Sequence, residues 1–246
     1  MKIQQLFDEL EKIKETSKST FEISGMVNRF KEMKYGFFPL GWGILNENNK
    51  TNDLAPTTEI EEGGIIVLGN DFGTVSYVDG YVNDGRKKIG EIDSKTINNL
   101  LNTKVGLDTD KTFFTNFYLG VRTHANATMT KRVEELRDNY KEICYKFFLT
   151  QLNLINPKII ICLGHDVRNA LLESKESNLF INWKPKSITM KKLYERGENS
   201  YEINIESKDL GERKFIVIPH PCYIGNLKKG YMEKLNKILE DKGLSI

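Results

Sequence analysis

The sequence predicts an α/β fold: a three-layer αβα sandwich around a four-stranded, mainly parallel sheet. Four short runs are almost wholly apolar and lack polar alternation; they are GGIIVLG (63–69), KTFFTN (111–116), PKIIICLG (157–164) and KFIVIPH (214–220). Strands buried on both faces show this pattern. Helical patterns separate several of the runs, and each run ends in a polar or glycine-containing turn. Alternation of buried strands with helices is typical of a parallel sheet.

The N-terminal part is expected to be a helical and irregular extension, residues 1–60, packed on a core domain of residues 61–246. A first helix is expected over 2–17, where apolar residues recur at helical spacing; these are Ile3, Leu6, Phe7, Leu10 and Ile13. A second helix is expected over 25–34. The segment 35–58 is rich in glycine, proline and asparagine, which predicts irregular structure.

Helices and a hairpin are expected between and after the buried strands. Asp93 can cap a helix over 92–103. The longest helix is expected from about Thr130 to Asn153, stopped by Pro157. Its predicted core face consists of Val133, Leu136, Tyr140, Ile143, Phe147 and Leu154. Later elements are a helix over 165–174, a hairpin over 186–206 with its turn at RGEN (196–199), and a last helix over 228–242.

Composition indicates one sizeable domain and excludes several classes of protein. The chain has 246 residues and a net charge of +2, so any nucleic-acid footprint must be local. No apolar run approaches the length of about 18 residues that a membrane span needs, and the charged N-terminus lacks a signal-peptide pattern. The cysteines Cys144, Cys162 and Cys222 are scattered, as expected of reduced thiols in a cytoplasmic protein. We expect a monomer without metal or cofactor.

Polar residues follow the four predicted strands. The turns are GNDFG (69–73), Asn116, GHD (164–166) and HPCYIGN (220–226). Open parallel sheets bind ligands at the carboxyl ends of their strands. The sequence therefore predicts that an asparagine, an aspartate and a histidine gather at one edge. Taken alone, the asparagine and the aspartate can be ordinary turn residues, and the histidine can be a satisfied core or cap histidine.

These motifs resemble those of the uracil-DNA glycosylase superfamily, over about residues 62–240. In that superfamily a first motif has the form G-x-x-P-[YG], the second strand ends in Asn, and a final motif begins with His-Pro. Here they read GNDFG, FFTN and HPCYIGN, and NPKIIICLGHDVRNALL (156–172) is similar to the third strand and following helix. The chain departs from the pattern at Phe72, where proline is usual, and in the loop 121–130.

The resemblance implies a catalytic set of Asp71, His220 and Asn70. Breaking a pyrimidine N-glycosidic bond creates a cation-like sugar and an anionic base, which a carboxylate and a hydrogen-bond donor stabilise respectively. Asp71 matches the residue that orients water, and His220 matches the donor to the base oxygen. Asn70 matches a neighbouring contact to the backbone and base.

The resemblance also implies a base pocket. Asn116 would pair with the Watson–Crick edge of the base, because an amide offers a donor and an acceptor. Gly69 lets the backbone approach the ligand, and Phe72 would form an apolar wall. In uracil-specific members a tyrosine at the position of Gly73 excludes bases substituted at C5, so glycine leaves that space open. Alternatively, Gly73 only serves the turn and Tyr77 or Tyr81 fills the space.

DNA contacts are expected from the last motif and from one basic segment. Ile224 and Leu227 are candidates for a wedge that replaces the extruded base, with Lys228 and Lys229 on phosphates. The segment 183–197 carries five Lys or Arg against one Glu, interleaved with Trp183 and Tyr194, and can form a backbone or stacking surface. The alternative for both is an ordinary solvated face.

These observations predict a monofunctional DNA glycosylase that flips out uracil or a C5-modified pyrimidine and leaves an abasic site. Such an enzyme serves base-excision DNA repair or, if the base is hypermodified phage DNA, antiviral defence. Two alternatives remain open: a nucleoside or nucleotide N-glycosidase acting on free substrates, and a DNA-binding module without catalysis. Asp71 and His220 argue against the last, since a binding module needs neither.

Overall fold

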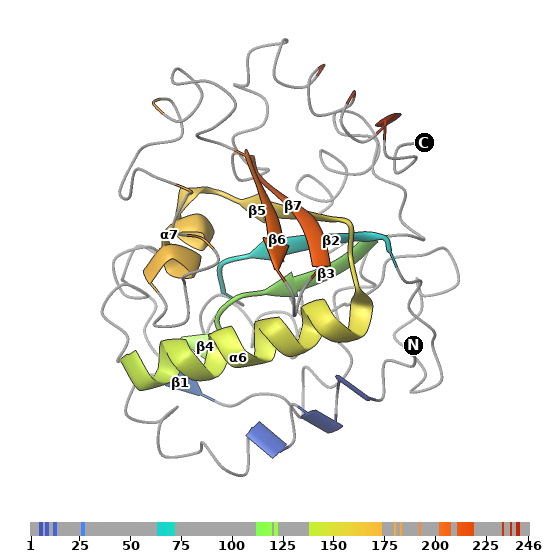
Figure 1. The fold of residues 1–246 in the computed structure, drawn as a ribbon. Coiled ribbons are helices and arrows are strands. Elements are labelled where there is room, and N and C mark those ends of the chain that lie inside the picture. The colour runs from blue at the N-terminus through green and yellow to red at the C-terminus, as the bar shows by residue number, and fades with distance from the viewer. Residues whose placement is uncertain are drawn as a thin grey trace, which may run out of the picture.

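The computed structural model describes residues 5, 6, 8, 9, 12, 13, 26, 27, 63–71, 112–119, 121, 122, 138–173, 180, 183, 192, 202–207, 211–218, 233, 237, 240 and 241. They contain a five-stranded sheet in the order β3-β2-β5-β7-β6 (Figure 1). Four strands are parallel: β2 (Ile65–Gly69), β3 (Thr112–Asn116), β5 (Ile159–Leu163) and β7 (Gly211–Ile218). All four predicted strands are confirmed, and so is the α/β fold class.

The fifth strand, β6 (Glu202–Ser207), lies antiparallel to β7 at the edge of the sheet. The sequence prediction had four strands and paired this segment with the residues before it, across the RGEN turn. The structure gives it β7, the strand that follows, as its partner; the RGEN turn lies outside the described residues. The end of this strand alternates like a half-exposed strand: Ile205 is buried, whereas Asn204 and Glu206 are exposed.

The central strands are buried on both faces. Every residue of Ile65–Leu68 in β2 and of Ile159–Cys162 in β5 has an exposed fraction of 0%. Since successive side chains in a strand point to opposite faces, both faces of these strands are covered. This burial explains why their sequences lack polar alternation.

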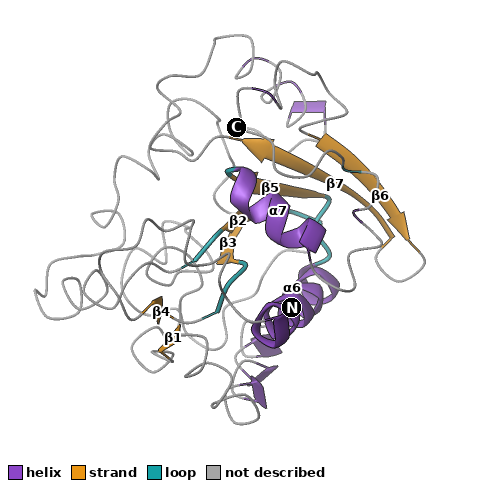
Figure 2. Ribbon diagram, turned by 90° about the vertical axis from the view of Figure 1, so that its left-hand side faces the viewer, coloured by secondary structure: helices purple, strands orange, loops and turns teal. Residues whose placement is uncertain are grey.

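Helices α6 (Asp138–Ile155) and α7 (His165–Glu173) pack on the same face of the sheet (Figures 1 and 2). The ring of Phe148 in α6 lies 6.4 Å from that of Phe215 in β7. Lys141 Nζ in α6 lies 3.2 Å from Glu173 Oε2 in α7, which joins the two helices at their outer sides. Both helices were predicted.

The ends and the buried face of α6 refine the prediction. Residues 130–137 lie outside the described part of the chain, and the helix ends where Asn156 takes a positive φ of 49° before Pro157. Tyr140 and Phe147 are buried as predicted, but Ile143 and Leu154 are only partly buried. The residues of α6 with an exposed fraction of 0% are Tyr140, Cys144, Tyr145, Phe148, Gln151 and Leu152. The predicted core face did not include Gln151, because a polar residue is not expected in a buried stripe.

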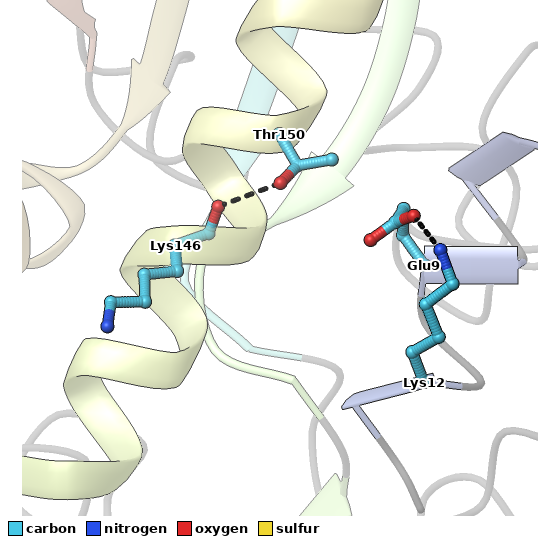
Figure 3. A network of polar contacts seen from close by, with 4 residues as sticks. All are labelled: Glu9, Lys12, Lys146 and Thr150. Carbon is cyan, nitrogen blue, oxygen red and sulfur yellow. Dashed lines mark hydrogen bonds and ion pairs between the residues drawn. The ribbon is translucent and has the colours of Figure 1, made fainter. Parts of the chain in front are cut away.

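The described residues near the N-terminus include part of a helix. Residues 5, 6, 8, 9, 12 and 13 are helical and Leu6 is fully buried, in agreement with the helix predicted over 2–17. Glu9 Oε1 pairs with Lys12 Nζ at 2.5 Å on the exposed side of this helix, and this raises the pKa of Lys12 (Figure 3).

A side chain of α6 bonds to the backbone of its own helix. The Thr150 hydroxyl donates to Lys146 O at 3.1 Å, which satisfies a polar side chain within the helix (Figure 3).

A two-stranded ribbon joins the N-terminal part to the segment after β3. Its strands are β1 (Met26–Val27) and β4 (Val121–Arg122), which run antiparallel with Val27 opposite Val121. The helix predicted over 25–34 is therefore wrong at these two residues. The physical reason is that a distant partner strand supplies hydrogen bonds that outweigh local helical spacing.

The remaining predicted elements are only partly covered. Glu233, Lys237, Glu240 and Asp241 are helical and exposed, in agreement with the last helix. The helix predicted over 92–103 and the irregular segment 35–58 lie outside the described residues. In the part of the chain that the structure describes, no helix has the length and apolar character required to cross a membrane.

Candidate active site

The carboxyl ends of β2 and β3 meet at one edge of the sheet. Gly69 is the register partner of Asn116, so the turn after β2 begins beside the asparagine that ends β3. Two further hydrogen bonds continue this pairing beyond the strands. Phe117 N donates to Gly69 O at 2.9 Å, and Tyr118 N donates to Asn70 O at 2.9 Å. The two motifs therefore form one backbone unit.

Asn70 and Asp71 form the polar tip of this unit. Both are partly buried, and Asn70 Nδ2 donates to Asp71 Oδ2 at 3.2 Å. This bond orients the carboxylate from one side. The other amide atom, Asn70 Oδ1, is buried and has no hydrogen-bond partner among the described residues. A buried amide oxygen of this kind can accept a hydrogen bond from a ligand.

Asn116 is almost completely buried, with an exposed fraction of 2%. A buried amide must satisfy both its donor and its acceptor, which is the property required to recognise the edge of a nucleobase. Its register partner, Gly69, has no side chain that could occupy the adjacent space on that face. The structure thus brings together Gly69, Asn70, Asp71 and Asn116, as the strand-end argument predicted.

Aromatic side chains pack in the segment that follows Asn116. The ring of Tyr118 stacks on that of Tyr140 of α6, with centroids 6.1 Å apart and an interplanar angle of 15°. Leu119 N donates to Cys144 Sγ at 3.4 Å. Cys144 lies one helical turn after Tyr140 in α6. Burial raises the pKa of Cys144 to about 12 and raises the pKa of Tyr140 well above its ordinary value. The nearby charge of Asp71 adds to the shift of the Tyr140 pKa.

Sequence reasoning did not identify Tyr118 or Tyr140 as parts of the site. Tyr140 was expected only in the helix core, and Tyr118 was not singled out. A usable signal is the position of Tyr118 directly after the strand-ending asparagine and its phenylalanine neighbour. Contact with Tyr140, however, depends on how α6 packs.

A third strand end lies at the same edge. After β5, Gly164 has a φ of 91°, and its N–H donates to Ile218 O of β7 at 2.7 Å. His165 and Asp166 then begin α7, with His165 Nε2 3.1 Å from Asp166 Oδ1. Both side chains are partly exposed. The GHD turn is therefore beside the first motif, because β5 neighbours β2 in the sheet.

Several predicted site residues lie outside the described part of the chain. These are Phe72, Gly73, Tyr77, His220, Ile224, Leu227, Lys228 and Lys229. Strand β7 ends at Ile218, two residues before His220, at the same carboxyl edge as the other parallel strands. The roles of these eight residues stay predictions. Among the described residues, no cluster of three or more His, Cys, Asp or Glu side chains could hold a metal ion.

Trp183 is not available for the nucleic-acid stacking surface that its basic surroundings had suggested. Its exposed fraction is 0%, and its ring packs against Phe180 and Phe215 at 6.4 and 6.1 Å. The guanidinium of buried Arg168 lies 5.3 Å from the ring centroid and donates to Trp183 O. The prediction for Trp183 is wrong because packing against the sheet buries it; Tyr194 lies outside the described residues.

The fold and this edge define the class of protein. It is an α/β protein whose parallel strands end in a partly buried Asn-Asp turn and a buried asparagine. A comparison with protein families matches residues 60–241 to the Uracil DNA glycosylase superfamily. The chain belongs to this superfamily, and the resemblance found from its motifs is confirmed. Membership indicates a glycosylase acting on DNA. A search of curated proteins finds no match for the chain.

Proposed function

We propose that the protein is a monofunctional DNA glycosylase that removes uracil or a C5-modified pyrimidine and leaves an abasic site. The observation that carries this proposal is the register of β2 and β3, which joins the Asn70–Asp71 turn to Asn116. The superfamily match supports it. An extruded base held by Asn116 would leave its sugar near a carboxylate, as the chemistry requires.

In the proposed reaction, the bond between C1′ of the deoxyribose and the ring nitrogen of the base breaks. The bonding electrons leave with the base, and water adds to C1′. Asp71 stabilises the cation-like sugar and accepts a proton from the attacking water. His220 donates a hydrogen bond to the oxygen of the departing base, where negative charge develops. Asn70 orients Asp71 through the bond between Nδ2 and Oδ2.

The choice of base would depend on Gly73. A glycine there removes the side chain that excludes C5 substituents in uracil-specific relatives, so the pocket would accept a pyrimidine modified at C5. Bulky substituents at this position occur in hypermodified phage DNA. We therefore propose antiviral defence as the biological setting, with repair of uracil as the alternative.

The test is a glycosylase assay on a panel of oligonucleotides. Duplex and single strands would carry uracil, 5-hydroxymethyluracil, 5-hydroxymethylcytosine or its glucosylated form, and abasic sites would be revealed by alkaline cleavage. Free nucleosides would be tested in parallel. Cleavage of DNA but not of nucleosides supports the proposal. Cleavage of nucleosides alone supports the small-molecule N-glycosidase, and tight DNA binding without any cleavage supports the binding module.

Asp71→Asn is the control for contaminating glycosylases, because it keeps the size of the side chain and removes its charge. Activity that this substitution leaves unchanged would not belong to the proposed site. Cleavage confined to plain uracil would retain the glycosylase and overturn the open C5 pocket.

A further inference from the structure

We propose that Tyr118 and Tyr140 are positioning residues that hold the Asn70–Asp71 turn in its reactive geometry. This inference rests on the proposed function, because it assigns the reaction to that turn. Neither tyrosine is expected to touch the base. They would act through the backbone of Asn70 and through the surroundings of the Asp71 carboxylate.

The first support is a set of three consecutive backbone donors. Phe117 N bonds to Gly69 O, and Tyr118 N bonds to Asn70 O, both at 2.9 Å. Leu119 N bonds instead to Cys144 Sγ at 3.4 Å. The segment that follows Asn116 is thus attached to the catalytic turn on one side and to α6 on the other.

The second support is the aromatic stack between these two attachments. Tyr118 is 2% exposed and Tyr140 is 0% exposed, and their rings are nearly parallel. A stacked, fully desolvated pair resists displacement because any movement loses packing on both rings. Since Tyr140 belongs to the long helix α6, the stack transmits the rigidity of that helix to Tyr118, whose N–H holds Asn70.

The third support is electrostatic. Burial is the main cause of the raised pKa of Tyr140, and the charge of Asp71 adds to it, because a nearby carboxylate disfavours ionisation of the phenol. Tyr140 stays neutral at physiological pH. Both rings are buried, and a buried aromatic pair next to the turn lowers the local dielectric, which strengthens the attraction of a carboxylate for a cationic sugar.

The experiment uses paired substitutions with a matched control. Tyr118→Leu and Tyr140→Leu remove the stack, whereas Tyr118→Phe and Tyr140→Phe keep it. Tyr145→Leu is the control, because Tyr145 is equally buried in the same helix but packs against Phe180, 6.4 Å away, and has no place in the proposed site. Thermal unfolding of every variant gives the stability loss against which activity is compared.

The measurements are the single-turnover rate on the oligonucleotide that the wild-type enzyme cleaves and the Kd for that DNA. Each leucine variant is expected to lose about tenfold or more in rate with Kd changed less than about threefold, because misplaced groups slow the chemical step. Each phenylalanine variant should recover the rate to within about threefold. Tyr145→Leu should lose stability but keep its rate. If the loss of rate follows the loss of stability in the same way in all three leucine variants, the control included, the proposal is overturned.

A second readout needs no activity. Amide hydrogen exchange in peptides covering residues 66–71 and 117–119 reports opening of the turn. Tyr118→Leu should speed exchange there, while Tyr145→Leu should not. If the wild-type protein cleaves none of the substrates, the proposed function fails, yet exchange still decides the positioning role. Unchanged exchange in Tyr118→Leu would overturn that role. Each tyrosine is tested separately. If a variant of one tyrosine does not fold, the variants of the other tyrosine still decide the proposal.

Discussion

Gly69 and Asn116 lie directly opposite each other at the carboxyl edge of the sheet, as register partners in β2 and β3. The pairing puts a residue with no side chain beside a buried amide. It also sets where the following residues go, because Phe117 N and Tyr118 N bond to the turn that β2 enters. Backbone pairing therefore sets the position of the first motif relative to the residues that follow Asn116.

The role of Asp71 can be tested by Asp71→Asn. We expect the single-turnover rate to fall about a hundredfold or more, because the neutral amide neither stabilises the sugar cation nor accepts a proton. DNA affinity should stay nearly the same. Asp166→Asn is the matched control at the end of the neighbouring strand and should keep its rate. Equal effects of the two substitutions would contradict the assignment.

Asn116→Ala should abolish recognition of the base while leaving non-specific DNA affinity almost intact, since phosphate contacts lie elsewhere. Competition binding and single-turnover cleavage would measure the two effects separately. Thr115→Val is a control on the same strand. Thr115 is fully buried and its hydroxyl has no hydrogen-bond partner among the described residues, so this change should be neutral or stabilising. Parallel loss of cleavage and of all DNA binding in Asn116→Ala would indicate misfolding instead.

Gly73→Tyr should restore steric exclusion at C5 and suppress cleavage of 5-hydroxymethyl and glucosylated bases more than that of uracil. Gly73→Ala is the control, because its Cβ brings the same backbone strain at this turn as tyrosine does but does not fill the space beside C5. Single-turnover rates on the three bases measure the effect. If both variants lose activity equally on all bases, the turn needs glycine for its backbone and the pocket reading is wrong.

Stability should fall at alkaline pH through Cys144. Burial raises the pKa of this thiol from 9.0 to about 12, so the folded state keeps a proton that the unfolded state releases. Its contribution is full below pH 9 and declines between pH 9 and 12, with a limiting slope of about 1.4 kcal/mol per pH unit. Urea unfolding between pH 7 and about 10.5 should show a shallower decline in Cys144→Ala. Identical slopes would contradict this expectation.

Arg168→Ala should destabilise the fold by about 3 kcal/mol, because it leaves a cavity and removes the donor to the buried carbonyl of Trp183. Arg168→Met should cost less, about 1–2 kcal/mol. Methionine fills most of the volume and avoids burying a charge, whose desolvation lowers the pKa of Arg168 to about 10. Chemical denaturation measures both variants. A larger loss for methionine than for alanine would contradict this account.

The four parallel strands could be predicted from sequence because double burial selects unbroken apolar runs, as in Ile159–Leu163. The strand-end rule then located Asn70, Asp71 and Asn116. What escaped prediction depends on partners distant in the chain. Met26–Val27 became a strand because Val121–Arg122 offers an edge.

Side-chain environments show the same limit. Local charge suggested an exposed Trp183, but Phe180, Phe215 and Arg168 enclose it. Tyr140 was predicted to be buried, yet its stacking partner could not be foreseen, because the contact depends on the position of α6 against the residues after β3. Periodicity in the sequence indicates that a residue is buried. Which residues it contacts depends on how the elements pack.

The ribbon of β1 and β4 also determines where the chain can be cut. The superfamily match begins at residue 60, which suggests a fragment starting there for expression. Such a fragment would lose Met26–Val27 and leave Val121–Arg122 as an open strand edge shortly after Asn116. Open edges recruit strands from other molecules. A fragment that begins before Met26 keeps the partner strand of Val121–Arg122, so the family boundary is not a safe boundary for a truncated protein.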